Sequence, residues 1–464
     1  MSCPDRANRT ESDVSETGWL ETWSAFAAAC RLEDIDAATR ARARTTLADT
    51  LGAIAAGQQE PEIAALAARL EAAGGSGPMT AVIATPRLLP ASAAVFVNGV
   101  AGTALELDEG NRFARGHPSI HVLPAAVAAA ERHGRSGADF LLALCLGYEI
   151  GARIGAAATL RPGYHPHGTW GVVGAALAVA KLAGADARAI ARSVNIAAAL
   201  SLATSMRSAL EGATVRNAYA GVANQLGLMA WEMAASGFGG EADGVATVFG
   251  RISGQDFRPA AMTEALGTRW EIARNYFKRH ACCRYNHAAL DALEDLAARH
   301  GRVDPAAIAR VRIETYGAAA ELNGRAPPTA LAARFSLPWA AASFLLRGAA
   351  DVPAFRSAAL DDAATLALAA RVDVAEDPAM TARLPAQRPA RVRIALTDGR
   401  VLEAERASNR GDADDPYPGA AIAAKFIDLA SPAFGAAGAA ALLKDAEAIE
   451  GFALFSDFSR RFRV

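Results

Sequence analysis

LEDIDAATRARARTTLADTLGAIAAG, residues 32–57, is a run of Ala and Leu with apolar side chains at helical spacing. The same texture returns in HVLPAAVAAAERHG, residues 121–134, and extends from about Trp19 to Gly267. Ala and Leu are strong helix formers, and β-branched runs are scarce in this region. We therefore expect residues 18–267 to form a helical domain.

The texture changes after residue 267, where β-branched and alternating segments occur. ARVRIETY covers residues 309–316, and PARVRIALTDGRVLEAE covers residues 389–405 with Asp398-Gly399 as a hairpin signal. Helical segments such as HAALDALEDLAARHG separate them. We predict a smaller α+β domain over residues 268–409, inserted as a lid, and helices over residues 410–464 that return to the first domain. The predicted fold class is mainly α.

The composition is that of a globular chain large enough for two domains: 464 residues, 52% hydrophobic, with a formal net charge of −2. No basic run stands out, so we expect no nucleic acid as a partner. Residues 1–17 are polar and lack the apolar core of a secretory signal, which predicts a flexible leader and no membrane segment there. Five cysteines without CxxC spacing indicate a reduced, cytoplasmic setting.

Histidines locate the chemistry, because six of only eight fall in three short segments. These are RGHPSIH at 115–121, GYHPHGT at 163–169 and KRHACCRYNH at 278–287. Gly, Pro and polar residues interrupt each segment, which is typical of helix ends and loops that line clefts. Imidazole exchanges its proton near neutral pH, so two of these segments can supply a base and an acid. A single histidine beside a proline is also common as a capping or packing residue.

Cofactor sites are weakly indicated. His117 and His121 are four residues apart but enclose a proline, and no segment has HExxH spacing. A metal site built from these histidines and the nearby carboxylates Glu106, Asp108 and Glu109 is the less favoured alternative. The glycines of 163–174 and 237–244 follow no predicted strand and do not fit a dinucleotide fingerprint. We expect no cofactor and no metal.

A cysteine nucleophile is a second alternative. Cys283 is adjacent to Arg284 and close to Lys278, and such cations lower a thiol pKa. The simpler interpretation is that Cys282 and Cys283 are small residues that pack at the start of a helix.

Five segments, in this order, resemble the MmgE/PrpD family, which includes 2-methylcitrate dehydratase, cis-aconitate decarboxylase and iminodisuccinate epimerase. They are FVNGVAGTALELDEGNRFARGHPS (96–119), GYHPHGTWGVVGAALAVAKLAG (163–184), EGATVRNAYAGVANQLGLMA (211–230), YFKRHACCRYNHAALDA (276–292) and RFSLPWAAA (334–342). The resemblance covers nearly the whole chain and implies a homodimer without a cofactor.

The resemblance also implies roles for particular residues. The family's acidic segment falls on Glu106 and Asp108, and its two His-Pro histidines fall on His117 and His165. Its basic positions fall on Arg216 and Lys278, and Cys283 stands where the decarboxylases have His.

Two departures leave the substrate open. The first acidic position, usually Asp, is Glu106, and the next polar position, often Thr or His, is occupied by Gly110 and Asn111. These leave undecided which of Glu106 and Asp108 is the functional carboxylate.

The chemistry that these proteins share gives each candidate a purpose. Dehydration, decarboxylation and epimerisation of polycarboxylates build up negative charge on a carboxylate, which preorganised cations must stabilise. We predict a lyase of dehydratase type that acts on a small polycarboxylate, with His117, His165, Lys278, Asp108 and Glu106 as catalytic residues. Substrate-binding residues are expected among Arg216, Asn111, Arg279, Cys283, Arg284 and His287. Decarboxylation, epimerisation, a metal-dependent lyase and a non-catalytic binding protein are the alternatives.

Overall fold

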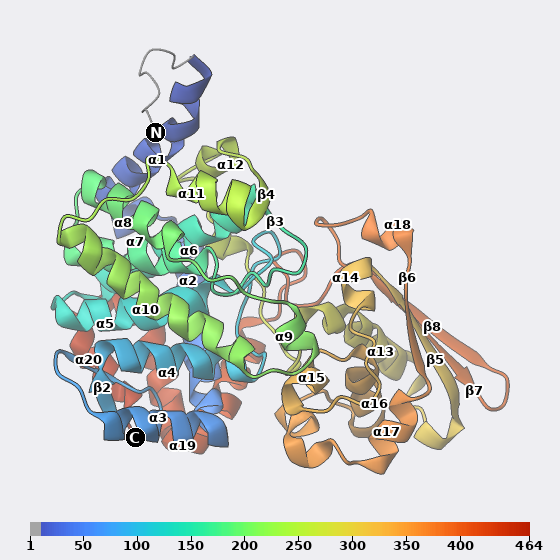
Figure 1. The fold of residues 1–464 in the computed structure, drawn as a ribbon. Helices are drawn as coiled ribbons and strands as arrows, with labels where there is room; N and C mark the ends of the chain where they lie inside the picture. The colour runs from blue at the N-terminus through green and yellow to red at the C-terminus, as the bar shows by residue number, and fades with distance from the viewer. Residues whose placement is uncertain (1–10) are drawn as a thin grey trace.

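The computed structural model describes residues 11–464, which form a large helical body and a smaller α+β body side by side (Figure 1). The expected leader falls outside the described residues for residues 1–10, whereas residues 11–17 belong to helix α1. The helices of the large body are α1 (Glu11–Ala29), α2 (Ala37–Gly57), α3 (Pro61–Ala73), α4 (Ala91–Ala104), α5 (Pro118–Arg132), α6 (Gly137–Ala157), α7 (Gly171–Ala183), α8 (Ala187–Ala199), α9 (Arg207–Leu210), α10 (Val215–Ala235), α11 (Gly244–Thr247) and α12 (Ala260–Thr263).

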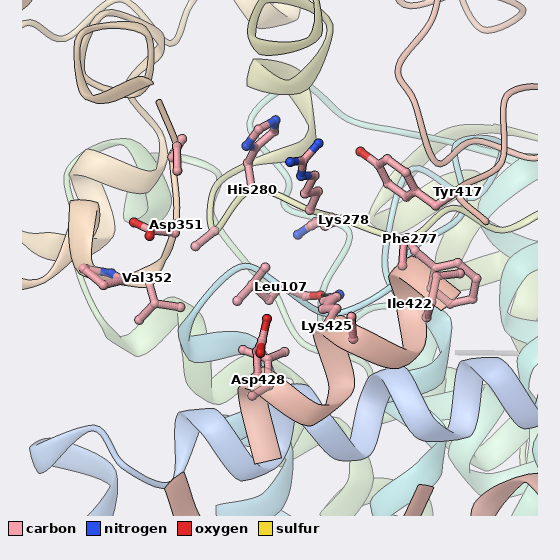
Figure 2. Close-up of a pocket in the computed structure, with 18 of the residues that line it drawn as sticks. Leu107, Phe277, Lys278, His280, Asp351, Val352, Tyr417, Ile422, Lys425 and Asp428 are labelled. Carbon is pink, nitrogen blue, oxygen red and sulfur yellow. Dashed lines mark hydrogen bonds between the residues drawn. The ribbon is translucent and has the colours of Figure 1, made fainter. Parts of the chain in front are cut away.

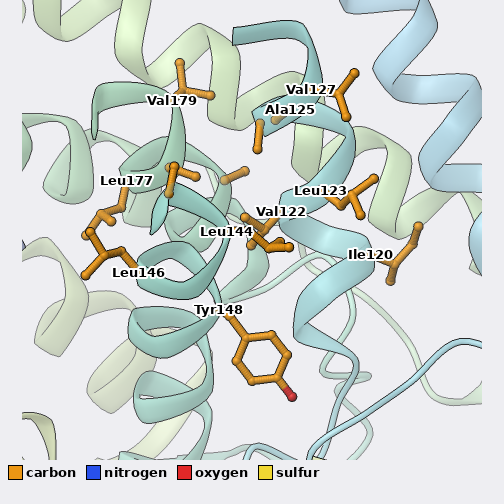
Figure 3. Close-up of a cluster of buried hydrophobic side chains, with 14 of the residues drawn as sticks. Ile120, Val122, Leu123, Ala125, Val127, Leu144, Leu146, Tyr148, Leu177 and Val179 are labelled. Atoms are coloured by element: carbon orange, nitrogen blue, oxygen red, sulfur yellow. The ribbon is translucent and has the colours of Figure 1, made fainter. Parts of the chain in front are cut away.

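Helices α5, α6 and α7 form the centre of the helical body, where their aliphatic side chains pack together (Figure 3). Gly147 of α6 faces Gly174 of α7, and a Cβ at either glycine would lie 2.6–2.7 Å from the carbonyl oxygen of the other. This contact between two backbones requires glycine on both helices. It brings α7 close to α5, which carries the first histidine segment.

Two short sheets join distant parts of the helical body, and the sequence did not predict them. β1 (Met79–Ala81) pairs with β2 (Leu88–Pro90), and β3 (Ala158–Leu160) pairs with β4 (Gly254–Phe257), both antiparallel. The second pair connects the end of α6 to a segment about a hundred residues later.

The smaller body is built on a four-stranded sheet of order β6-β5-β7-β8. Its strands are β5 (Ile308–Thr315), β6 (Val372–Glu376), β7 (Ala390–Leu396) and β8 (Val401–Arg406). Only β5 and β6 run parallel, and β7 and β8 form the hairpin predicted at Asp398-Gly399, where Gly399 has φ 88°. Buried and half-buried residues alternate along β7, so one face of the sheet packs on helices. The helices of this body are α13 (His287–His300), α14 (Gly317–Ala320), α15 (Ala330–Arg334), α16 (Leu337–Arg347), α17 (Ala363–Ala369) and α18 (Pro378–Thr381), of which α13, α14 and α16 contact the sheet.

The chain then returns to the helical body through α19 (Gly419–Glu447) and α20 (Phe455–Ser459). Helix α19 packs along α2, with Phe426 against Gly52. One hydrophobic core contains residues from 19–272 and 426–462, and a second contains mainly residues 281–404.

Two of the described helices, α6 and α19, are long and apolar enough to cross a membrane by length and composition alone. In α6, 94% of the most apolar window is buried inside the protein, so it is a core helix. In α19 the buried share is 22%, and the rest of this Ala-rich surface is open in the single chain.

Candidate active site

The acidic segment between α4 and α5 forms one wall of a buried cavity of about 40 Å³. Glu106 is fully buried there with φ 54°, a left-handed conformation that costs about 1 kcal/mol or more in a residue other than glycine. Residues from the helical body that line the cavity include Glu106, Arg115, His117, His165, His167 and Arg216. Residues after 267 that line it include Tyr276, Cys283, Arg284, Tyr285, Phe335 and Arg388.

His117 lies at the N-cap of α5, directly before Pro118, and its ring is held by two oxygen atoms. Its Nδ1 is 2.7 Å from the Glu109 carbonyl oxygen and 3.0 Å from Asp108 Oδ2. Both neighbours are acceptors, so Nδ1 carries the proton and donates it, and Nε2 keeps its lone pair. The hydrogen bond goes to the carbonyl group, and Asp108 acts chiefly through its charge. His117 is thus oriented as a base.

His165 is held between two N–H donors. Its Nδ1 accepts the backbone N–H of His167 at 3.1 Å, and the Nε–H of Arg216 donates to its Nε2 at 3.4 Å. Burial and the Arg216 charge hold the pKa of His165 well below its usual value, so the ring is neutral. A neutral ring accepts at one nitrogen only, so each tautomer makes one of these two hydrogen bonds. His165 and Arg216 thus lie in contact on the cavity wall.

His121 and His167 complete a cluster of four imidazoles, and sequence reasoning assigned neither of them to the site. His121 donates from Nδ1 to the His117 carbonyl and accepts the Gly168 N–H at Nε2, so it holds the two histidine segments together. The His167 ring stacks edge-on against three rings, with centroids 4.8 Å from His117, 4.9 Å from His121 and 4.5 Å from His165. Neither His167 nitrogen has a hydrogen-bond partner among the described residues, although the ring is buried.

Glu106 forms ion pairs with two of the residues predicted as cations of the site. It forms ion pairs with Arg216 and, at 3.2 Å, with Lys278, whose Nζ also lies 3.6 Å from Asp108. Burial alone would raise the pKa of both acids, but the contact of His117 with Asp108 and the facing charges of Arg216 and Lys278 lower it. Both carboxylates are therefore ionised and neutralised inside the protein.

Lys278 does not line the histidine cavity. It lies behind Glu106 and lines a second, larger cavity of about 690 Å³, between α19 and residues 277–281 (Figure 2). Lys278 is fully buried, so its ammonium group acts on the histidine cavity through Glu106 and Asp108. His117 and His165, two of the predicted catalytic residues, thus line one cavity. Lys278, the third, is connected to that cavity only through Glu106 and Asp108.

Comparison with known proteins gives the family. The family model described as MmgE/PrpD N-terminal domain matches residues 21–254, and that described as MmgE/PrpD C-terminal domain matches residues 280–448. The chain belongs to the MmgE/PrpD family. A cis-aconitate decarboxylase-like protein oryM of Aspergillus oryzae is 32% identical over 235 residues, 46% of this chain and 48% of that protein. A cis-aconitate decarboxylase of Aspergillus terreus is 30% identical over 228 residues, 45% and 46% respectively. Each alignment spans about half the length of the relative.

Three predicted binding residues of this MmgE/PrpD protein lie away from the histidine cavity. The Asn111 side chain bonds to the backbone of Glu271, Phe113 and Ala114, so it shapes the acidic loop. Arg279 is exposed, lines the larger cavity and pairs with Glu294 at 2.6 Å. His287 accepts from Arg284 and lies 3.3 Å from the Cys282 carbonyl, behind the cavity wall. Their places in the sequence motifs suggested that these three residues bind substrate, but their side chains do not line the histidine cavity.

Two other predicted residues do line the cavity, in altered roles. Arg284 is paired with Asp412 at 2.8 Å, so its charge is already compensated. Burial raises the pKa of Cys283 to about 11, which keeps the thiol protonated and argues against a cysteine nucleophile. Among the residues the structure describes, no group of three His, Cys, Asp or Glu side chains has the arrangement of a metal site.

The glycine at position 110 is explained by Tyr276. A Cβ at Gly110 would lie 2.3 Å from the Tyr276 hydroxyl, and the two backbones exchange hydrogen bonds of 2.7 and 3.1 Å. A tyrosine hydroxyl from the next domain therefore fills the space that a longer side chain would take.

Proposed function

We propose that this chain is a lyase that moves a proton at the carbon next to a carboxylate of a small di- or tricarboxylic acid, with dehydration as the reaction. The observation that carries the proposal is that His117, His165 and Arg216 line one cavity. His117 offers a lone pair at Nε2, and Arg216 offers a positive charge beside His165.

The proposed first step is proton abstraction. His117 Nε2 takes the proton from the carbon, and the electron pair moves into the neighbouring carboxylate, which becomes an enediolate. The Asp108 charge beside Nδ1 stabilises the imidazolium that forms. The enediolate then collapses and the C–O bond of the hydroxyl on the next carbon breaks. That hydroxyl takes the proton back from the His117 imidazolium and leaves as water, so His117 is neutral again.

The growing negative charge needs donors that are already in place. Arg216 supplies N–H groups and a positive charge on the cavity wall, with its Nε 3.4 Å from His165 Nε2. His165 is neutral, so it contacts this guanidinium without adding a charge of its own.

Decarboxylation is the second candidate, because the relatives that match are named cis-aconitate decarboxylase. The same groups serve it in a different order: carbon dioxide leaves first, and an imidazolium then protonates the carbon. Epimerisation would need proton return from the other side of the carbon.

The test is incubation of the purified chain with citrate, 2-methylcitrate, cis-aconitate and iminodisuccinate, with products identified by NMR. Water loss from one of the hydroxy acids supports the proposal, and carbon dioxide loss from cis-aconitate selects the second candidate. Activity should persist after treatment with a chelator. A folded protein that converts none of the four, and exchanges no C–H proton of any, would be a binding protein instead.

A further inference from the structure

Most of the positive charge around the histidine cavity is already compensated by the protein. Arg216 and Lys278 pair with Glu106, and Arg284 pairs with Asp412. A substrate carboxylate that took one of these cations would leave a buried protein carboxylate without its partner, which is costly. Binding a polycarboxylate therefore requires at least one further cation.

Arg388 is a buried cation on this cavity that has no carboxylate partner among the described residues. Its side chain is 5% exposed, and no carboxylate oxygen of the described residues lies within 4.0 Å of its guanidinium nitrogens. The nearby Asp412 is engaged by Arg284 at 2.8 Å and by Arg112 at 3.5 Å. Burying an unpaired charge is unfavourable, so the position of Arg388 implies an anion that arrives from outside.

The hydrogen bonds of Arg388 agree with this. A guanidinium has five N–H donors, and within the described part of the chain Arg388 uses one of them, from Nη2 to the Arg112 carbonyl at 3.0 Å. The guanidinium carbon Cζ of Arg388 lies 5.6 Å from the Tyr285 ring centroid. This contact positions the planar guanidinium without neutralising its charge. The remaining donors are free for the two oxygens of a carboxylate, for which a guanidinium fork is well matched.

Arg115 is the other cavity arginine without a carboxylate partner among residues 11–464. It differs in that it is exposed and donates to the Ala158 carbonyl at 2.7 Å. Arg115 thus stands at the rim, whereas Arg388 lies inside, directly before β7 of the smaller body.

We propose that Arg388 binds a substrate carboxylate, the one remote from the carbon that reacts at His117. This inference rests on the proposed function. Because Arg388 belongs to the smaller body and the histidines to the helical body, one substrate molecule then contacts both. Acids that lack this remote carboxylate therefore bind more weakly than acids that carry it.

The experiment compares wild type with Arg388→Gln and Arg388→Lys. For whichever polycarboxylate the wild type converts, we expect KM to rise about 10- to 100-fold in Arg388→Gln, with kcat changed less. Arg388→Lys keeps the charge but loses the fork, and its KM should fall between the two. Arg393→Gln, a change on the exposed face of β7, is the matched control and should leave KM unchanged. Equal KM values in wild type and Arg388→Gln would overturn the proposal.

Binding of tricarballylate, a tricarboxylate without a hydroxyl group to lose, separates this inference from the proposed reaction. Calorimetry should give a dissociation constant at least tenfold weaker for Arg388→Gln than for wild type. If wild type converts no acid but shows this difference, the proposed function fails and the role of Arg388 stands. Equal affinity, or no binding to either protein, overturns the role of Arg388. Should Arg388→Gln not fold, Arg388→Lys decides: an affinity equal to wild type contradicts the carboxylate fork.

Discussion

At the scale of single residues, the tautomer of His117 carries the account. It follows from a backbone contact, because the Glu109 carbonyl accepts from His117 Nδ1 and Nε2 keeps its lone pair. The charge of Asp108 lies beside the same Nδ1.

We expect His165→Ala to lower kcat by about two to four powers of ten, since it removes an imidazole that lines the cavity and contacts Arg216 there. Steady-state kinetics with the preferred acid measures this. His133, on the surface of the helical body, is the matched control as His133→Ala. Near-wild-type kcat in His165→Ala would remove this histidine from the mechanism.

Asp108→Asn should lower kcat about 10- to 100-fold with KM changed less than about twofold, because the variant keeps the shape but loses the charge beside the imidazolium. The His117 tautomer survives through the Glu109 carbonyl, so the loss should be smaller than that of His165→Ala. Asp398→Asn, at the exposed hairpin, serves as the control. A KM effect alone would assign Asp108 to binding rather than to His117.

At the scale of elements, close helix contacts set the distance between the histidine segments. Gly147→Ala places a Cβ 2.6 Å from the Gly174 carbonyl, so α6 and α7 must separate. We expect a loss of about 1–3 kcal/mol in the free energy of unfolding, measured by chemical denaturation. Gly18→Ala in α1, where a Cβ meets no atom within 4 Å, should be neutral or slightly stabilising. Equal stability in both variants would contradict the close contact.

Elements with a local signal could be predicted from the sequence, and elements without one could not. The β7–β8 hairpin follows from Asp398-Gly399 between alternating strands, and the Ala-rich helices follow from propensity. The β3–β4 pair has strands of three and four residues about a hundred positions apart, so nothing local specifies it. The acidic and histidine segments were found because each is a compact motif. Arg388 is one of 47 basic residues and belongs to no motif, and its importance arises only where the fold leaves it unpaired.

At the scale of the whole molecule, buried acids make stability depend on pH. Burial raises the pKa of Glu109 to about 8, and of Glu149 and Asp291 to about 7. From about pH 5 up to about pH 8 for Glu109, and up to about pH 7 for Glu149 and Asp291, the folded protein keeps these protons while the unfolded chain has lost them, so stability falls as pH rises. Glu109→Gln removes one such proton, and its melting temperature should decline less between pH 5 and pH 8 than that of wild type. The same slope in both proteins would contradict the raised pKa of Glu109.

The central claim is that His117 exchanges a proton with the carbon next to a substrate carboxylate. The direct measurement is deuterium incorporation at that carbon in D₂O, followed by NMR for wild type and for His117→Gln. The substrate is the acid that the wild type converts; if it converts none, each of the four acids is tested in turn. The account predicts incorporation by wild type and a loss of at least about a hundredfold in His117→Gln. Equal incorporation by both proteins, or none by folded wild type with any of the acids, would contradict it.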